Sequence, residues 1–392
     1  MDRVTAGPST PAGPLRVGVV VPSLGGGGAE FVAVQWAGYL RAHGHAVTMI
    51  TTHEPGAELG EVPVVGLTAG SFPARVRQLR AHVAGAGYDV LLGLMPHWNL
   101  LVLLAALAAP GGPATLISGR NVEAPLRRIH GLSYRAELAL CHLLYRRADG
   151  YVAISHPVAA EAAGTYGLDP EKVWVVPNPS TGKNPAAAAS VLRGHRTAAG
   201  GESVTLTVPA RLVPQKRPAL AVETAALLRD QHGVEASVDY FGAGPEESAV
   251  RAAAARLGVT VRFRGWVTSW FEAAAPDAVV LLPSAAEGFG NVLVEAAAAG
   301  MASVASSRAL GVADAIVPNV TGVFAMGSAP DDFAAAVRRA MALTPVSAPA
   351  WLERFSPEES GTKLLQVLRA VTDGRGQPRA TSEPASPYSR SA

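Results

Sequence analysis

The stretch Leu15-Arg-Val-Gly-Val-Val-Val-Pro22, followed by Gly25–Gly28, Ala29–His43 and His45–Thr51, decides the fold of this chain of 392 residues. Its continuous β-branched run predicts a strand buried on both faces of a parallel sheet. The glycines form a loop, and the helical pattern after them ends at Gly44, a typical C-cap. A strand, a Gly-rich loop, a helix and a second strand in this order are typical of a doubly wound α/β sheet.

The same alternation of strands and helices fills the rest of the chain and divides into two sets. One set runs to Val176, and the other runs from Ser203 to Leu343. Within the first set we expect a helix at Leu100–Ala109 with Asn99 as its N-cap. Ligands of open parallel sheets bind beyond the carboxyl ends of the strands, so two Rossmann-like sheets that face each other predict a central cleft between the domains.

Length and composition agree with two domains, because 392 residues exceed one ordinary core and 49% of them are apolar. The predicted boundaries are a disordered leader at 1–14, a first domain at 15–180, a linker at 181–202, a second domain at 203–355, a helix at 356–372 that packs back toward the first domain, and a disordered tail at 373–392.

Charge and cysteine usage exclude several classes of protein. A formal net charge of +2 is too small to argue for nucleic-acid binding. The single cysteine, Cys141, rules out an internal disulfide, which suits the reducing cytoplasm. No apolar stretch is long enough to span a bilayer. We therefore expect a cytoplasmic protein, with peripheral contact to the inner face of the membrane left open.

The most informative segment is Leu281–Gly300, which predicts a strand, a loop and a helix. Glu287 lies in the loop, and Glu295 lies in an otherwise apolar helix, where a buried carboxylate needs a partner. Gly288 and Gly290 let the backbone approach a ligand. Asn291 is placed to cap the helix, whose free N–H groups then face an anion.

This segment resembles the E-x7-E signature of the retaining glycosyltransferases with the GT-B fold, the large family 4 (glycosyl transferases group 1). Glu287 and Glu295 have its spacing, and Gly288-Phe289-Gly290 matches its usual Gly-Phe-Gly. The resemblance implies a GT-B fold, with acceptor binding in the first domain and nucleotide-sugar binding in the second.

A second match follows the first strand of the second domain. Val208-Pro-Ala-Arg211-Leu-Val-Pro-Gln-Lys216-Arg-Pro resembles the family element Gly-Arg-Leu-x-x-x-Lys-Gly, with Ala210 in place of the first glycine and Arg217-Pro218 in place of the last. An Arg and a Lys five residues apart can clasp a pyrophosphate.

Further matches keep the family's order along residues 15–370. They are Gly25–Glu30, Val152–Ser155, Val175–Asn178, Phe241–Glu246, Phe263–Trp266 and Pro276–Ser284. The resemblance implies a donor site formed by Gly27, Gly28, Arg211, Lys216, Gly242, Gly265, Trp266, Gly288, Phe289, Gly290, Asn291, Val292 and Glu295. The loop at Gly25–Glu30 departs from a dinucleotide fingerprint, because Glu30 stands where the third glycine belongs, and this makes an oxidoreductase a poor match.

The resemblance also implies a mechanism. Arg211 and Lys216 neutralise the leaving pyrophosphate, Glu295 holds the ribose, and Glu287 holds the donor sugar. Transfer then occurs with retention and without a metal or other cofactor, since two cationic side chains replace the metal and no D-x-D motif is present.

Five residues of the first domain are candidates for the acceptor side: His97, Asn99, Arg120, Asn121 and Glu123. His97 follows a strand and lies in a region where related enzymes contact the donor sugar, which makes it a candidate catalytic residue; a structural hydrogen-bonding role is the alternative. Arg120 and Glu123 either bind polar groups of the acceptor or pair with each other.

The acceptor is left open between two classes. One is a small molecule, as in antibiotic or other secondary-metabolite (for example aminoglycoside) biosynthesis, and the other is a lipid-linked oligosaccharide or an exopolysaccharide. UDP is the donor nucleotide expected from family frequency. A GT-B epimerase or phosphorylase and a non-catalytic nucleotide-sugar-binding module are the rival functions. The oligomeric state is left open.

Overall fold

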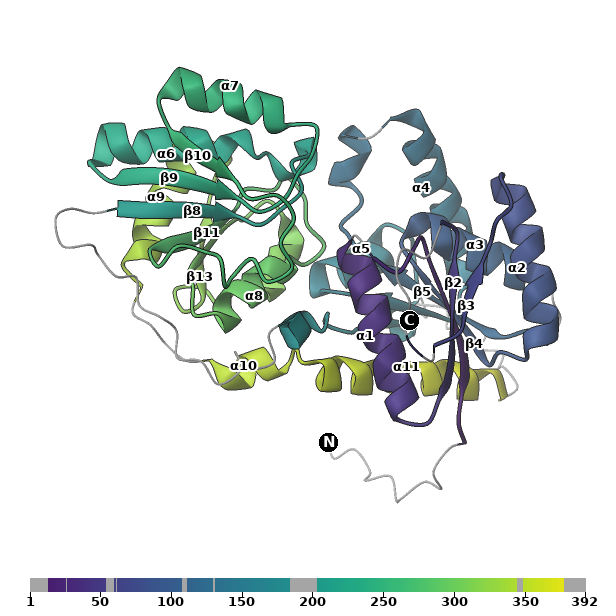
Figure 1. Cartoon of the computed structure of the whole chain (residues 1–392). Coiled ribbons are helices and arrows are strands. Elements are labelled where there is room, and N and C mark those ends of the chain that lie inside the picture. The colour runs from purple at the N-terminus through teal and green to yellow at the C-terminus, as the bar shows by residue number, and fades with distance from the viewer. Residues whose placement is uncertain are drawn as a thin grey trace, which may run out of the picture.

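The computed structural model describes residues 13–25, 27–53, 60, 62–107, 111–129, 131–183, 203–343 and 348–376. These residues form two α/β domains side by side, each built on one parallel sheet (Figure 1). The strand orders are β3-β2-β1-β4-β5-β6-β7 and β10-β9-β8-β11-β12-β13. Each sheet grows outward from its first strand in both directions, so both are doubly wound, and the predicted fold class is confirmed.

The first sheet consists of β1 (Arg16–Val21), β2 (Ala46–Thr51), β3 (Val64–Gly66), β4 (Val90–Leu94), β5 (Ala114–Gly119), β6 (Gly150–Ala153) and β7 (Val173–Val175). Its main helices are α1 (Gly28–Ala42), α2 (Phe72–Ala86), α3 (Pro96–Ala106), α4 (Leu132–Leu144) and α5 (His156–Gly164). Five of the six residues of β1 are buried, as a strand covered by helices on both faces requires.

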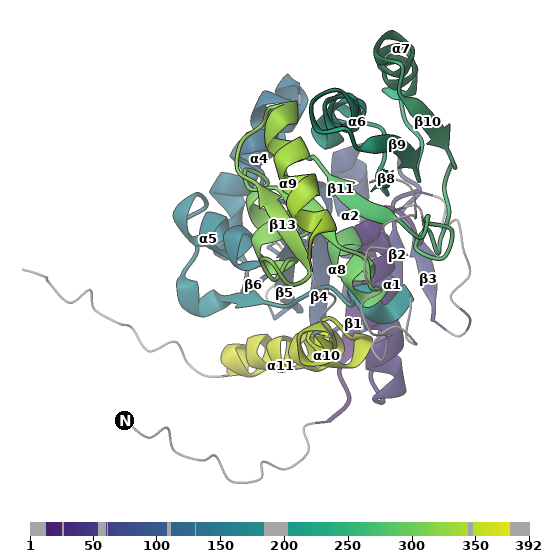
Figure 2. The ribbon, with the colours of Figure 1, turned by 90° about the vertical axis from the view of Figure 1, so that its left-hand side faces the viewer.

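The second sheet consists of β8 (Ser203–Val208), β9 (Glu235–Tyr240), β10 (Thr260–Phe263), β11 (Ala278–Leu282), β12 (Ser303–Ser306) and β13 (Gly322–Ala325). Its helices are α6 (Ala219–His232), α7 (Glu247–Leu257), α8 (Asn291–Ala298), α9 (Pro330–Met341) and α10 (Pro349–Glu353). Figure 2 views the molecule from the side of this domain, with α9 in front of β13.

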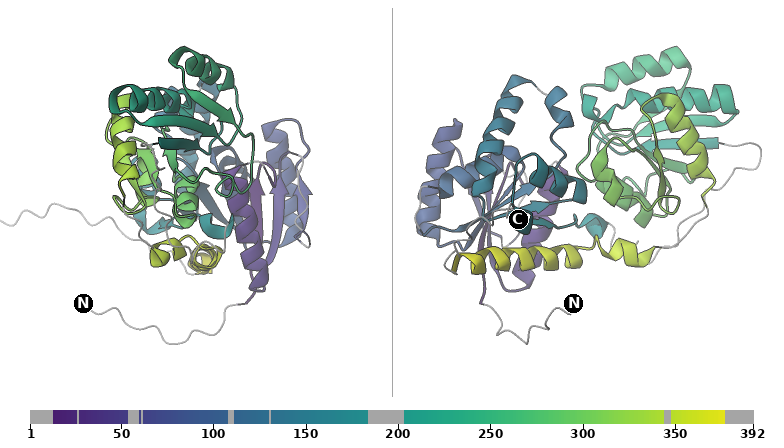
Figure 3. Two further views of the ribbon diagram at one scale, coloured as in Figure 1. Left: turned by 60° about the vertical axis from the view of Figure 1, so that its left-hand side comes forward. Right: turned by 180° about the vertical axis from the view of Figure 1, so that it is seen from behind.

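The last helix, α11 (Pro357–Gly376), runs back along the first domain beside α1 (Figures 1 and 3). Trp36 of α1 donates an indole hydrogen bond of 2.9 Å to Ser360, and Tyr39 lies 2.9 Å from the hydroxyl of Thr362. The described part of the helix includes residues 373–376, which the prediction assigned to the tail at 373–392. Residues 1–12, 184–202 and 377–392 of the predicted leader, linker and tail lie outside the described residues.

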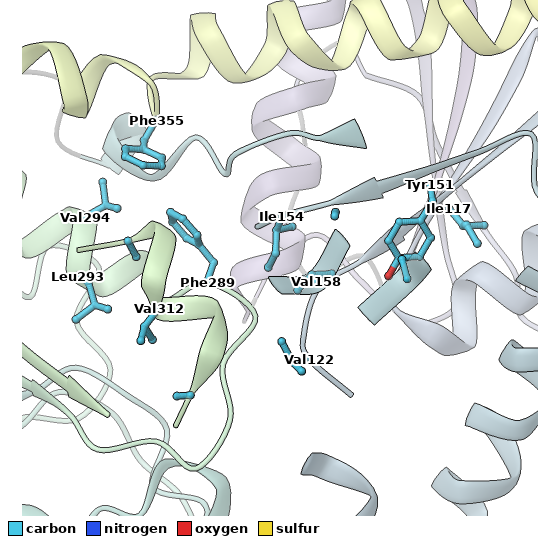
Figure 4. Close-up of a cluster of buried hydrophobic side chains, with 14 of the residues drawn as sticks. Ile117, Val122, Tyr151, Ile154, Val158, Phe289, Leu293, Val294, Val312 and Phe355 are labelled. Atoms are coloured by element: carbon cyan, nitrogen blue, oxygen red, sulfur yellow. The ribbon is translucent and has the colours of Figure 1, made fainter. Parts of the chain in front are cut away.

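One apolar core continues from the first domain into the second. Figure 4 shows Ile117, Tyr151 and Ile154 of the first domain in the same cluster as Phe289 and Phe355. Since apolar side chains from both domains are buried together, the two domains are packed against each other through a shared hydrophobic contact. Within the described ranges, none of the helices combines the length and the apolar composition needed to span a bilayer.

Candidate functional site

The loops after β8 and β11 bring the first pair of predicted site residues together. The ammonium of Lys216 lies 2.5 Å from Oε1 of Glu287, and Ser284 donates a hydrogen bond of 2.6 Å to the same oxygen. Both loops leave the carboxyl edge of one sheet, because β8 and β11 are parallel neighbours. Within the described residues both recorded partners of this carboxylate bind Oε1, and Oε2 has none.

Arg211 lies in the same loop as Lys216 but is exposed, and no contact of its guanidinium with another described residue is recorded. The loop is held by close backbone packing: a Cβ added to Gly242 would lie 2.1 Å from the carbonyl oxygen of Ala210. Gly242 is therefore required by packing next to Arg211, and its expected contact with the donor stays a prediction.

The second signature carboxylate is deeply buried. Glu295 is 2% exposed on α8, and each of its oxygens has one partner. Lys183 binds Oε1 at 2.8 Å, and the indole N–H of Trp270 donates to Oε2 at 2.7 Å. The sequence indicated that a carboxylate in this apolar helix needs a partner, and these two side chains are its partners.

The N-terminus of α8 differs from the prediction. Gly290, with φ of 95°, is the N-cap and carries no side-chain cap, so the predicted cap by Asn291 is wrong. The Asn291 side chain instead accepts hydrogen bonds from Asn178 (2.7 Å) and Ser180 (3.1 Å). Within the part of the chain that the structure describes, no side chain accepts from the first N–H groups of α8, as an anion-binding helix end requires. Val292, the next residue, is half-buried.

Gly288 lies where the two domains touch. Its carbonyl accepts a hydrogen bond of 2.7 Å from Ser155, and a Cβ at this position would lie 2.3 Å from the carbonyl oxygen of Arg120. The neighbouring side chain of Phe289 is buried against Phe355 and belongs to the core, and the predicted contact of this residue with the donor stays a prediction. Gly288 therefore allows the backbones of the two domains to approach each other closely. The sequence had suggested such a close approach between Gly288 and a ligand.

Arg120 does not pair with Glu123. Its guanidinium donates to Asn178 at 2.6 Å and lies 5.4 Å from the centre of the Trp36 ring. Burial lowers the pKa of Arg120 to about 9, while nearby Glu30 acts in the opposite direction. Since Asn178 in turn donates to Asn291, this arginine is the first member of a hydrogen-bonded chain that crosses from the first domain to α8.

Glu123 is buried and accepts a short hydrogen bond from the hydroxyl of Tyr134. Burial raises the pKa of Glu123 to about 7; the Tyr134 hydrogen bond opposes this rise and the carboxylate of Glu161 adds to it. The side chain of Asn121 accepts a hydrogen bond of 3.1 Å from its neighbour Val122. These contacts are local to the first domain, and the acceptor roles stay predictions.

Asn99 is buried inside the first domain, and its predicted acceptor role stays a prediction. Helix α3 begins at Pro96, not at Leu100, and Asn99 lies in its first turn, 0% exposed. Its amide donates to the carbonyl of Ser118 (3.0 Å) and to the hydroxyl of Tyr145 (2.9 Å), and its oxygen accepts from the N–H of Ser118 (3.2 Å). These hydrogen bonds join α3 to β5 and satisfy the buried side chain.

His97 is half-buried between the rings of Phe72, at 4.9 Å, and Trp98, at 5.1 Å. Burial lowers its pKa, and Arg75 and His53 lower it further. Among the described residues, no recorded contact joins His97 to the Lys216–Glu287 pair. Its role toward the donor sugar stays a prediction.

The remaining predicted donor residues lie in two loops. A Cβ on Gly28 would lie 3.5 Å from the amide nitrogen of Asn291, so the glycine loop of the first domain adjoins the N-terminus of α8. The carboxylate of Glu30 folds over Gly27. Gly265, with φ of 69°, turns the chain after β10 and leaves Trp266 68% exposed. This exposed ring is available for stacking.

Sequence reasoning missed Lys183 and Trp270 as partners of Glu295. Lys183 fell inside the predicted linker, although the chain contains only four lysines and this one could have been singled out. Trp270 lies in an irregular segment between β10 and β11, where no motif indicated a contact.

Two family models match the chain, one for each sheet. The model described as Glycosyltransferase Family 4 matches residues 26–179, and the model described as Glycosyl transferases group 1 matches residues 203–342. A D-inositol 3-phosphate glycosyltransferase of Kribbella flavida is 34% identical over 206 residues, which are 48% of this chain and 47% of that protein. A protein of the same name from Segniliparus rotundus is 29% identical over 66% of this chain and 58% of its own length. Matches to such curated relatives thus span about half of their length.

Solved structures share the fold over almost the whole chain. The lipopolysaccharide outer core galactosyltransferase WaaB superposes with a TM-score of 0.71 at 18% identity, over 91% of this chain and 99% of that one. HepE of Anabaena, solved with UDP and glucose, superposes with a TM-score of 0.71 at 17% identity, over 91% of this chain and 100% of that one. At these identities the likeness establishes the two-domain fold.

Proposed function

This chain belongs to the family 4 glycosyltransferases and has the GT-B fold, and from that premise we propose that it transfers a sugar from a nucleotide diphosphate sugar to a hydroxyl group of an acceptor. The observation that carries the proposal is the Lys216–Glu287 pair: a cation and a carboxylate, 2.5 Å apart, at the carboxyl edge of the second sheet. A substrate that carries both phosphates and sugar hydroxyls needs this combination of charges.

The cations stabilise the leaving group. Lys216 has three N–H donors, so it can keep its bond to Glu287 while it donates to a phosphate oxygen. Arg211 is exposed in the same loop and supplies the second cation. The uncapped N-terminus of α8 adds backbone N–H donors at Gly290 and Asn291. Each such preorganised donor lowers the barrier by about 2–4 kcal/mol.

The carboxylates orient the sugar and the nucleoside. Lys216 and Ser284 fix Oε1 of Glu287, which leaves Oε2 for a hydroxyl of the donor sugar. Glu295 binds the hydroxyls of the ribose. The acceptor hydroxyl attacks on the face from which the phosphate departs, so the anomeric configuration is retained. Arg211 and Lys216 supply the positive charge that a metal would otherwise provide, and the reaction needs no metal.

We propose UDP as the donor nucleotide and a small polyhydroxylated ring as the acceptor. The HepE structure, which contains UDP and glucose, supports the nucleotide, and the relatives named D-inositol 3-phosphate glycosyltransferase support a cyclitol. An aminocyclitol of the kind used in antibiotic biosynthesis presents the same ring of hydroxyl groups.

The test is UDP release from UDP-glucose, UDP-galactose or UDP-N-acetylglucosamine, each alone and with D-inositol 3-phosphate or 2-deoxystreptamine. We expect release that depends on acceptor and persists in EDTA, and a product whose anomeric configuration by NMR equals that of the donor. Tight binding of nucleotide without release under any of these conditions would indicate a binding module.

Two substitutions locate the activity. Lys216→Ala and Glu287→Ala should each lower turnover about a hundredfold or more without unfolding the protein. Lys363→Ala is the matched control, because Lys363 pairs with Glu359 at 3.0 Å on α11, away from the site. Near-normal turnover in either site variant would refute the assigned roles.

A further inference from the structure

The contacts of Glu295 point to a role for a residue in the segment that connects the domains. Glu295 lies on α8 with Val294 and Ala296, both 0% exposed, on either side. Burial of a carboxylate among apolar side chains is unfavourable unless a cation and hydrogen bonds compensate. What holds this carboxylate in place therefore decides whether it can act on a ligand.

Lys183 supplies the cation and Trp270 supplies the second hydrogen bond, one to each oxygen. The side chain of Lys183 is 22% exposed and that of Glu295 is 1% exposed, so solvent screens the pair weakly. A carboxylate can accept about four hydrogen bonds. Two partners thus fix the orientation of Glu295 and leave acceptor positions for the hydroxyls of a ligand.

Lys183 is itself held in place, although it lies at the start of a long connection. The preceding residues form a 3-10 turn, η4 (Ser180–Lys183), in which Thr181 donates to the carbonyl of Phe355 at 3.1 Å. The ammonium of Lys183 lies 5.2 Å from the centre of the Phe31 ring on α1. The cation is therefore presented to α8 from a fixed position between the two domains.

We propose that Lys183 is a positioning residue for the donor: it holds the Glu295 side chain in the orientation in which this carboxylate binds the ribose hydroxyls. The inference rests on the proposed function, in which Glu295 contacts the ribose. Both signature glutamates then carry a lysine partner, Glu287 from the second domain and Glu295 from the connection between the domains.

The experiment compares two nucleotides by calorimetry, UDP and 2′,3′-dideoxy-UDP, which lacks the ribose hydroxyls. Wild type should prefer UDP by about tenfold or more, the range expected for hydrogen bonds to a charged group. Lys183→Met should weaken the binding of UDP about tenfold. It should leave the affinity for the dideoxy nucleotide within about threefold of the wild-type value, so the preference for UDP disappears. Lys183→Arg should restore most of it, and Lys363→Met should behave as wild type.

The outcomes separate this inference from the proposed function. A general loss of structure would weaken both nucleotides equally, and equal weakening in Lys183→Met would overturn the positioning role. In the Glu295→Gln background, Lys183→Met should change UDP affinity less than twofold, since the two residues act as one unit. If Lys183→Met does not fold, Lys183→Gln takes its place in the same comparison. Wild type that binds neither UDP nor UDP-glucose would instead refute the proposed function.

Discussion

Substitution of Gly288 by alanine should separate the two domains locally and reduce turnover about a hundredfold. A Cβ at this position would lie 2.3 Å from the carbonyl oxygen of Arg120 and 2.7 Å from Cα of Asn121. A relaxed C···O contact needs about 3.3 Å, so one side must move by about 1 Å. The backbone of Gly311 also packs closely against this loop, since its N–H donates to the carbonyl of Glu287 at 3.2 Å.

The shift matters because Glu287 immediately precedes Gly288, and a misplacement of about 1 Å of a group that positions the substrate lowers rates about a hundredfold. Overpacking should also reduce the free energy of unfolding by about 1–3 kcal/mol. The assay is acceptor-dependent UDP release, together with the melting temperature.

Two further variants serve as controls for Gly288→Ala. Gly70→Ala adds a methyl group where nothing lies within 4 Å, and should behave as wild type. Ser155→Ala removes the 2.7 Å hydrogen bond to Gly288 without adding atoms, and should lower turnover by about tenfold or less. Gly288→Ala turnover within about threefold of wild type, with an unchanged melting temperature, would refute the steric reasoning.

Three other predictions follow from the same structure. Burial raises the pKa of Glu123 to about 7, above the unfolded value of about 4.3, so the stability that its bound proton provides is lost as pH rises from about 4 to about 7. The melting temperature of Glu123→Gln should consequently fall less than that of wild type as the pH rises from about 5 to about 8. Parallel curves of melting temperature against pH for the two proteins would contradict this. Ser360→Ala leaves the indole N–H of Trp36 and the carbonyl of Pro177 without their bonds of 2.9 and 2.6 Å, and should lower the melting temperature by about 2–8 °C in calorimetry; no change would mean that α11 is not anchored there. Trp266→Ala should weaken the binding of UDP about tenfold and leave the affinity for inorganic pyrophosphate unchanged, because an exposed ring stacks on a base. Equal affinity of variant and wild type for UDP would exclude a stacking role.

The sequence sufficed for the fold because its strands are short β-branched runs that recur with glycine loops between them. Helices α2 (Phe72–Ala86) and α5 (His156–Gly164) were not predicted, because both stretches follow loops and their helical patterns are weaker. It also placed the start of α3 at Leu100, because Met95-Pro96 resembles a loop; the structure uses Pro96 as the first residue of the helix.

The candidate site was predictable where each of its residues lies in a motif. Lys216 and Glu287 are brought together by two neighbouring parallel strands, so motif order and sheet topology were sufficient. Contacts between distant segments were not predictable in this way. Arg120 and Glu123 could pair by spacing, but the chain carries one toward Asn178 and the other toward Tyr134, and only packing decides between such alternatives.

These long-range contacts make the proposed donor site and the domain interface one physical unit. At the N-terminal end of α8 and in its preceding loop, Asn291 accepts from Asn178 and Gly288 accepts from Ser155. Glu295, in the middle of α8, binds Lys183, so all three contacts reach a residue outside the second domain. A nucleotide that orders this end of α8 stabilises the same backbone on which the domains meet. The two effects are linked: bound nucleotide makes opening of the interface less favourable by a certain free energy. A substitution that opens the interface must weaken nucleotide binding by that same free energy.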